Sequence, residues 1–162
     1  MNTIVLGVGE YGISRTPGTE IKTFALGSCI AVLLYDLKTK IGGMAHIALP
    51  HSSINPDRAQ ILPGYFSDTG VPALINSICS ASGKANGKGL LVKLAGGANM
   101  MTTHTAFNIG ERNLTAIRND LDGKGLVAMA EDVGGAISRT VTLDVDTGKV
   151  MIHSPGRGAW EL

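Results

Sequence analysis

The sequence predicts an α+β (α/β) layered sandwich, in which two main helices cover mixed, largely antiparallel sheets. Short runs rich in β-branched residues alternate with turn residues, and two other stretches show the apolar spacing of helices. The run from Ile30 to Tyr35 is apolar at odd and even positions alike, so both faces of that strand should be covered. We therefore expect a sheet that lies inside a stack of layers.

Composition limits both the architecture and the partners. The 162 residues, 44% of them apolar, suit one domain spanning 1–162 that needs neither disulfides nor metals for stability. The net charge of +1 and the 4% aromatic content give no sign of a nucleic-acid partner. The N-terminus lacks a signal peptide pattern and no apolar run approaches the ~20 residues of a membrane span, so we expect a cytoplasmic protein without membrane insertion. Its two cysteines should be free thiols.

The N-terminal strands are expected to form an antiparallel meander, beginning with strands at 3–8 and 20–26. Between them, Gly7-Val-Gly9-Glu-Tyr-Gly12 matches the dinucleotide fingerprint G-x-G-x-x-G. That fingerprint needs a helix after its third glycine to hold the pyrophosphate, whereas Pro17-Gly18 would end such a helix at once. We interpret these glycines as turn residues.

A β-hairpin is the central prediction. Two apolar runs, 29–35 and 41–50, are joined by the polar connection 36–40. If the loop has an even number of residues, His46 lies opposite Ala31. An odd-length loop would move His46 to the other face of the sheet.

The first helix is predicted where apolar residues from Val71 to Cys79 follow the spacing of one helical face. Pro72 is tolerated in a first turn, and Gly83 suits the C-terminal stop. Cys79 belongs to the apolar stripe and is interpreted as a packing residue. The preceding stretch, 51–70, is predicted to be irregular.

The second helix is predicted to begin at the N-cap Asn108, with Glu111 three residues later, and to end at Gly123. Before it, the paired glycines Gly96-Gly97 should let the backbone approach another segment closely. Residues 131–135 are predicted as a loop. The remaining strands are expected at 90–94, 126–130, 141–145 and 150–152, the last two as a closing hairpin.

Chemistry is most plausible at Cys29 and His46. With the even-length loop, Cys29 faces Ala48, and Cys29 and His46 become diagonal neighbours on one face, roughly 7–8 Å apart at the backbone. An imidazolium would lower the thiol pKa from about 8.5 and could then act as a general acid. Gly27 and Ser28 would leave backbone N–H groups near the sulfur for an oxyanion. The alternative is that both are ordinary buried residues.

Metal binding is the other reading of a cysteine and a histidine. The four histidines and two cysteines show none of the short paired spacings of zinc sites. Cys29 with His46 and His51 would be the best candidate set, and His104 and His153 are expected in loops or on the surface. We expect neither a metal nor a cofactor.

The chain resembles the CheD family, the chemoreceptor glutamine deamidases of bacterial and archaeal chemotaxis. The resemblance covers nearly the whole chain. The motifs that carry it, in order, are Thr23-Phe-Ala-Leu-Gly-Ser-Cys29, Gly42-Gly-Met-Ala-His46-Ile-Ala-Leu-Pro50, Gly96-Gly-Ala98, Asn108-Ile-Gly-Glu-Arg-Asn113, and Glu131-Asp-Val-Gly-Gly135 with Thr147-Gly148.

This resemblance implies a Cys-His-Thr triad that carries over to Cys29, His46 and Thr23, with the Thr23 hydroxyl orienting His46. It implies hydrolysis of receptor glutamine side chains to glutamate through a Cys29 thioester, with backbone amides near Ser28 and Cys29 holding the oxyanion. It also implies a fold related to the catalytic domain of cytotoxic necrotizing factor toxins. The implied partners are chemoreceptor cytoplasmic domains as substrate and the CheC phosphatase as a competing regulator.

Two other functions remain open on the sequence. A non-catalytic adaptor could bind receptors and the CheC phosphatase through its surface alone. A receptor methylesterase would share the nucleophile and differ in its leaving group.

Overall fold

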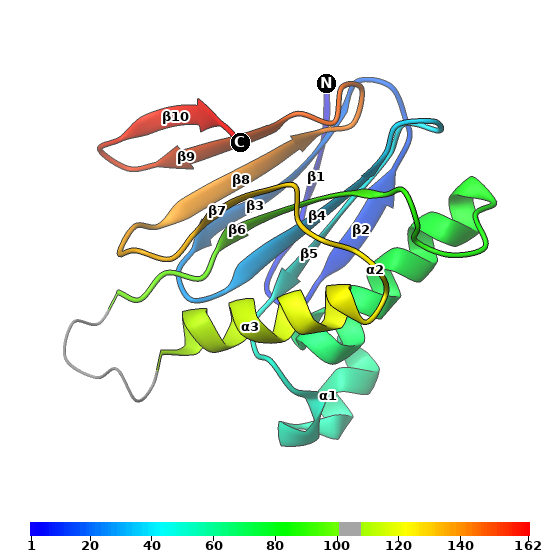
Figure 1. The fold of residues 1–162 in the computed structure, drawn as a ribbon. Helices are drawn as coiled ribbons and strands as arrows, with labels where there is room; N and C mark the ends of the chain where they lie inside the picture. Colours follow the sequence, from blue (N-terminus) through cyan, green and yellow to red (C-terminus); the bar gives the residue numbers. More distant parts are fainter. Residues whose placement is uncertain (101–107) are drawn as a thin grey trace.

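The computed structural model describes residues 1–100 and 108–162, which form two five-stranded sheets and a group of helices (Figure 1). The outer sheet has the strand order β1 (Asn2–Val5), β3 (Thr19–Leu26), β8 (Arg139–Asp144), β9 (Val150–Ser154), β10 (Gly158–Glu161). The central sheet has the order β2 (Tyr11–Ser14), β5 (Ile41–Ile47), β4 (Ile30–Asp36), β6 (Leu91–Gly96), β7 (Ala130–Val133). In the described chain, β1 with β3 and β6 with β7 pair in parallel and the other pairs are antiparallel, so the mixed, largely antiparallel prediction is confirmed.

The helices lie against the central sheet only, at the bottom of Figure 1. Their bounds are η1 (Ser52–Ile54), α1 (Pro56–Ile61), η2 (Pro63–Tyr65), α2 (Ser67–Ser82) and α3 (Ile109–Asp122). The layers are therefore outer sheet, central sheet and helices. The outward side of the outer sheet carries exposed apolar residues such as Phe24 and Met151, so the helices cover one sheet and not both.

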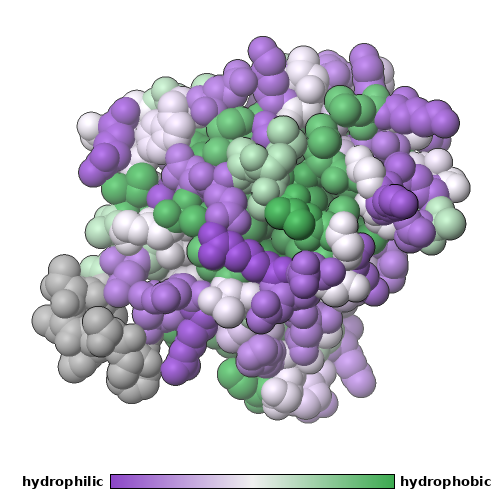
Figure 2. All heavy atoms as spheres, viewed as in Figure 1, coloured by the Kyte–Doolittle hydropathy of each residue, from purple (hydrophilic) through white to green (hydrophobic). Residues whose placement is uncertain are grey.

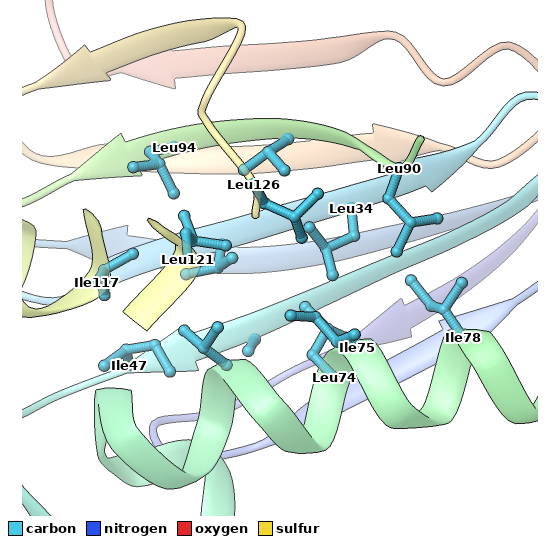
Figure 3. Close-up of a cluster of buried hydrophobic side chains, with 14 of the residues drawn as sticks. Leu34, Ile47, Leu74, Ile75, Ile78, Leu90, Leu94, Ile117, Leu121 and Leu126 are labelled. Atoms are coloured by element: carbon cyan, nitrogen blue, oxygen red, sulfur yellow. The ribbon is translucent and has the colours of Figure 1, made fainter. Parts of the chain in front are cut away.

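The helix-side core lies between the central sheet and the helices (Figure 3). Alternate residues of β4, including Leu34, meet Leu74 and Ile78 of α2 and Ile117 of α3, and all of these are buried. Gly43 of β5 allows the close approach of α2, because a Cβ there would lie 2.9 Å from Leu74 Cδ1. This layer is the conventional apolar core of the protein.

The inter-sheet core lies between the central and outer sheets. It takes the other alternate residues of the hairpin, such as Ala31, Leu33 and Met44, and packs them against outer-sheet residues that include Ile21 and Leu143. All seven residues of β4 are buried, as its two apolar faces predicted. One strand thus supplies both cores.

Both main helices are confirmed. Helix α2 ends at Gly83, which has a left-handed φ of 75°, and α3 begins after Asn108, whose side chain accepts from the Glu111 N–H at 3.1 Å. However, α2 begins at Ser67, and α1 and η2 precede it, so the prediction of an irregular stretch through 70 was wrong. The side chain of Asn55 caps α1. The helix was missed because the segment is polar and has no apolar periodicity that would indicate one.

Several strand predictions need correction. The opening strand ends at Val5 rather than at residue 8, and β2 and β10 were not foreseen. The strand expected at 126–130 lies at Ala130–Val133, in the segment predicted as a loop. In the described chain, this short edge strand pairs only with β6. Two of its residues are acidic, and acidic residues are uncommon in strands, so its sequence did not indicate a strand.

The expected N-terminal meander is wrong, because β3 and β4 belong to different sheets. The register between β3 and β8 shifts between Thr23 and Leu26, and Ala25 in this bulge has a φ of 53°. After the bulge, Leu26 still pairs with Arg139 in the outer sheet, and Gly27-Ser28-Cys29 then carries the chain to β4 in the central sheet. The predicted nucleophile therefore lies where the chain crosses between layers.

The face of the molecule seen in Figure 2 has apolar side chains gathered near its middle, between polar rims. Large apolar residues are exposed on the segment between α3 and β7, where Val127 is 79% and Met129 60% exposed. This segment begins beside the C-terminal end of α3.

No helix in residues 1–100 and 108–162 is long and apolar enough to cross a membrane.

Candidate active site

The hairpin register brings the predicted residues to one place. His46 pairs with Ala31, as an even-length loop predicted. Cys29 immediately precedes β4 and packs against the inter-sheet core, so it lies on the His46 side of the sheet. Thr23 reaches the same layer from β3 of the outer sheet, and both Thr23 and His46 are almost completely buried.

Thr23 and His46 are joined across the two sheets. Thr23 Oγ1 lies 2.7 Å from His46 Nδ1 and 2.8 Å from the Leu6 carbonyl oxygen. A hydroxyl has one proton, and only a donor can satisfy the Leu6 carbonyl, so Oγ1 accepts from a protonated Nδ1. The neutral imidazole therefore has its lone pair on Nε2, the tautomer that a general base needs.

His46 Nε2 is buried and has no hydrogen-bond partner in the described part of the chain, so its lone pair is not yet engaged by the thiol. Burial lowers the pKa of His46 to about 4, against a smaller opposing effect of the Glu10 carboxylate. Glu10 pairs with His46 through the backbone, the His46 N–H donating to the Glu10 carbonyl at 3.0 Å. A neutral imidazole is thus favoured at neutral pH.

The thiol is also favoured in its neutral form, because burial raises the pKa of Cys29. These directions are opposite to those of a resting thiolate and imidazolium pair, which the hairpin argument had led us to expect. The difference has a physical cause. A site enclosed between two sheets penalises both charged forms, and no second charge at hydrogen-bond distance compensates for this within the described residues.

The chain segment around Cys29 is anchored through three consecutive carbonyl oxygens. The Gly27 carbonyl accepts from Ala98 N–H at 2.8 Å and the Cys29 carbonyl from Gly97 N–H at 2.8 Å. The Ser28 carbonyl accepts from Asn113 Nδ2 at 3.0 Å. Within the described residues, no hydrogen bond occupies the N–H of Ser28 or of Cys29.

The paired glycines after β6 were expected to approach another segment, and that segment is Cys29. A Cβ on Gly96 would lie 2.3 Å from the Cys29 carbonyl oxygen, and one on Gly110 would lie 2.3 Å from the Gly97 carbonyl oxygen. Glycine at both positions lets the β6 end fit between Cys29 and the first turn of α3. The sequence signalled the close approach but not its target.

Asn113 was quoted only as part of a motif, and its role was missed. It is fully buried, and its Nδ2 contacts the carbonyls of both Ser28 and Ala48. The available signal was its position one turn before Ile117, on the buried stripe of α3, where a polar side chain requires internal partners.

Cys79 lies on α2 in the helix-side core, on the opposite side of the central sheet from Cys29. His51 and His153 are exposed, and His104 lies outside the described residues. In the described ranges, no group of three or more His, Cys, Asp or Glu side chains is placed to hold a metal ion.

Comparison with known proteins identifies relatives along the whole chain. A family model described as CheD chemotactic sensory transduction matches residues 48–154. A protein of Syntrophotalea carbinolica named probable chemoreceptor glutamine deamidase CheD is 49% identical over 162 residues, 100% of both chains. The chemoreceptor glutamine deamidase CheD of Thermotoga maritima is 38% identical over 95% of this chain and 93% of its own. The family model begins after His46, whereas the match with the S. carbinolica protein includes residues 23, 29 and 46.

Proposed function

The chain belongs to the CheD family, and we propose that it is a chemoreceptor glutamine deamidase with Cys29 as nucleophile, His46 as base and acid, and Thr23 as the group that orients His46. One observation carries the assignment of residues. The Thr23 hydroxyl holds the His46 imidazole with its unpartnered Nε2 in the same layer as the half-buried Cys29.

The neutral resting pair indicates how the reaction would begin. As the Cys29 sulfur attacks the glutamine carboxamide carbon, His46 Nε2 takes the thiol proton, so charge develops only with substrate in place. This requires the sulfur and Nε2 to come into hydrogen-bond contact, and such contacts often tighten only in the substrate complex. The N–H groups of Ser28 and Cys29, unoccupied in the described structure, would receive the oxyanion.

The second half of the reaction returns the protein to its starting state. The imidazolium gives its proton to the departing nitrogen, the C–N bond breaks and ammonia leaves, while the acyl group stays on the sulfur as a thioester. His46 then takes a proton from water as the water attacks the thioester carbonyl. The C–S bond breaks, glutamate is released and the thiol recovers its proton.

The family resemblance also supplies the biological setting of the proposal. The substrate would be the cytoplasmic domains of chemoreceptors, so the protein would act in the cytoplasm as a single 1–162 unit, and a CheC phosphatase would compete with receptors for it. The family resemblance also implies a fold related to the cytotoxic necrotizing factor catalytic domain, and the layered sheets agree with the α/β sandwich that this implies.

Mass spectrometry of receptor cytoplasmic fragments tests this function. Wild-type protein should replace the side-chain NH₂ of particular glutamines by OH and release ammonia, and Cys29→Ala should do neither. Methanol release from methylated fragments without ammonia release would identify a methylesterase instead. Binding of the fragments without any change in their mass, by wild type and Cys29→Ala alike, would identify an adaptor.

A further inference from the structure

Asn113 ties helix α3 to the two strands that carry the candidate site. Its Nδ2 donates to the carbonyl oxygens of Ser28 and Ala48, each at 3.0 Å. Both partners are acceptors, so the contacting atom must be the NH₂ group, and both of its protons are used. Ser28 directly precedes Cys29, and Ala48 follows the strand that carries His46. The amide therefore connects the two arms of the hairpin beside the nucleophile.

The contact with Ser28 fixes the direction of the Cys29 N–H. The Ser28 carbonyl and the Cys29 N–H belong to one peptide unit, and the described chain has no cis peptide bond. In a planar trans unit the C=O and N–H point in opposite directions. Because Asn113 holds the carbonyl towards α3, the Cys29 N–H points away from α3 and remains available.

The peptide units on either side of Ser28 are held by backbone N–H groups, whereas the Ser28 carbonyl is held by a side chain. Asn113 is therefore the anchor that a substitution can remove. The Gly27 and Cys29 carbonyls accept from the N–H groups of Ala98 and Gly97. Substitution of those residues keeps their N–H donors. In the described chain, the hydrogen bond recorded for the Ser28 carbonyl comes from the Asn113 side chain, so a substitution removes it.

Only the donating half of the Asn113 side chain has partners among the described residues. Asn113 is 0% exposed, yet its Oδ1 has no hydrogen-bond partner among the described residues. A buried amide oxygen without a partner is destabilising, and such atoms are rare in folded proteins. The defined contacts of this side chain are therefore those of its donating half, and both go to the strands that carry the candidate site.

We propose that Asn113 is a positioning residue that orients the Ser28–Cys29 peptide so that the Cys29 N–H forms one side of the oxyanion site. This inference rests on the proposed deamidase function and extends it to a residue on α3. Asn113 does not touch the reacting atoms; it acts through the Ser28 carbonyl.

The proposal separates two reactions of the same sulfur. Amide hydrolysis passes through an oxyanion and needs the oriented N–H, whereas alkylation by iodoacetamide displaces iodide at a saturated carbon and forms no oxyanion. Loss of the anchor should therefore slow deamidation about ten- to a hundredfold through kcat, with KM and the alkylation rate of Cys29 within about twofold of wild type.

The experiment compares Asn113→Ala and Asn113→Leu with wild type, Cys29→Ala and Asn119→Ala. Leucine keeps the side-chain volume, so it serves if the alanine variant does not fold. Asn119 is an exposed amide on the same helix and is the matched control. Ammonia release from a receptor cytoplasmic fragment gives kcat and KM, and mass spectrometry gives the rate of Cys29 alkylation.

A selective loss of kcat in an Asn113 variant, with normal alkylation and a normal Asn119→Ala, would support the proposal. Three results would overturn it: unchanged kcat, a parallel loss of deamidation and alkylation, or failure of both Asn113 variants to fold. Wild-type protein that releases no ammonia would instead overturn the proposed function itself.

Discussion

The two cores on either side of the central sheet are built from the same hairpin but differ in chemistry. The helix-side core consists of apolar residues and Cys79, and the buried polar residues Ser67 and Asn113 lie on the helices beside it. The inter-sheet core adjoins buried polar groups, among them Thr23, His46 and Arg139. Alternation along β4 and β5 sends neighbouring residues into these two environments. The central sheet therefore has the candidate catalytic residues Thr23, Cys29 and His46 on one side and mainly apolar packing on the other.

The buried polar groups beside the inter-sheet core differ in how completely they are hydrogen-bonded. Arg139 donates to Asp132 and to the carbonyls of Gly96 and Gly134, so its buried charge is compensated. His46 is satisfied at Nδ1 and unsatisfied at Nε2. Among the described residues, His46 Nε2 and Asn113 Oδ1 are the buried side-chain atoms without a hydrogen-bond partner, and such atoms call for an explanation, of which a catalytic role is one.

The largest expected effect distinguishes the two cysteines, one beside each core. Cys29→Ala should lower deamidation by about four orders of magnitude or more, because no other group can form the thioester. Cys79→Ala should keep the wild-type rate per folded molecule, since it removes only packing on α2. Ammonia release, normalised to folded protein by circular dichroism, measures both. Loss of activity in Cys79→Ala alone would show that the nucleophile is Cys79, in the helix-side core, and would contradict the assignment of Cys29.

The next expected effect is a loss of folding stability with no loss of catalytic rate. Leu74 is fully buried in the helix-side core, so Leu74→Ala should lower the free energy of unfolding by about 2–5 kcal/mol. If residues 1–162 form one domain, urea unfolding should remain a single transition. Activity per folded molecule should not change. A Leu74→Ala protein that is stable but slow would show that the two cores are coupled.

Thr23 tests the inter-sheet core more finely. Thr23→Val keeps the shape but removes the hydroxyl, leaving His46 Nδ1 and the Leu6 carbonyl without this partner. Deamidation should fall by about ten- to a hundredfold as the imidazole loses its fixed tautomer, and stability by about 1–3 kcal/mol. Thr23→Ser restores a hydroxyl and should recover most of the rate. Equal rates for the valine and serine variants would contradict an orienting role.

The sequence predicted those features that depend on local periodicity. The hairpin itself, both main helices and the closing hairpin follow from spacing and caps. The sequence left the hairpin register open between an even-length and an odd-length loop, and the structure has the even case, which places His46 on the Cys29 side of the sheet. The separation of β3 and β4 into two sheets did not follow from the sequence, because a short connection such as 27–29 can join strands of one sheet or of two.

Within the site, Thr23 came from the family resemblance and Asn113 was missed. Their contacts with His46 and with the Ser28 carbonyl join residues from different layers, which sequence spacing does not report. The pKa shifts that favour neutral Cys29 and His46 were not predicted either, because they depend on burial between the two sheets. The sequence spacing indicates that Cys29 and His46 lie close together. Their protonation states depend on burial between the two sheets, which spacing does not report.

The last expected effect is a pH dependence that arises in the inter-sheet core and is absent at neutral pH. Burial lowers the folded-state pKa of His46 to about 4 from an unfolded value near 6.5, so at intermediate pH the unfolded chain binds the extra proton. The free energy of unfolding should therefore fall as the pH drops from about 6.5 towards about 4, and this group should add no further change below that.

His46→Gln provides the control, because glutamine does not titrate. Urea unfolding of both proteins, at several pH values between neutrality and about 4.5, should give a difference in stability that moves against wild type as the pH falls. The exposed His51 and His153 are present in both proteins and cancel in that difference. If the difference instead moves in favour of wild type at low pH, His46 is stabilised as an imidazolium in the folded protein, and the neutral resting imidazole is wrong.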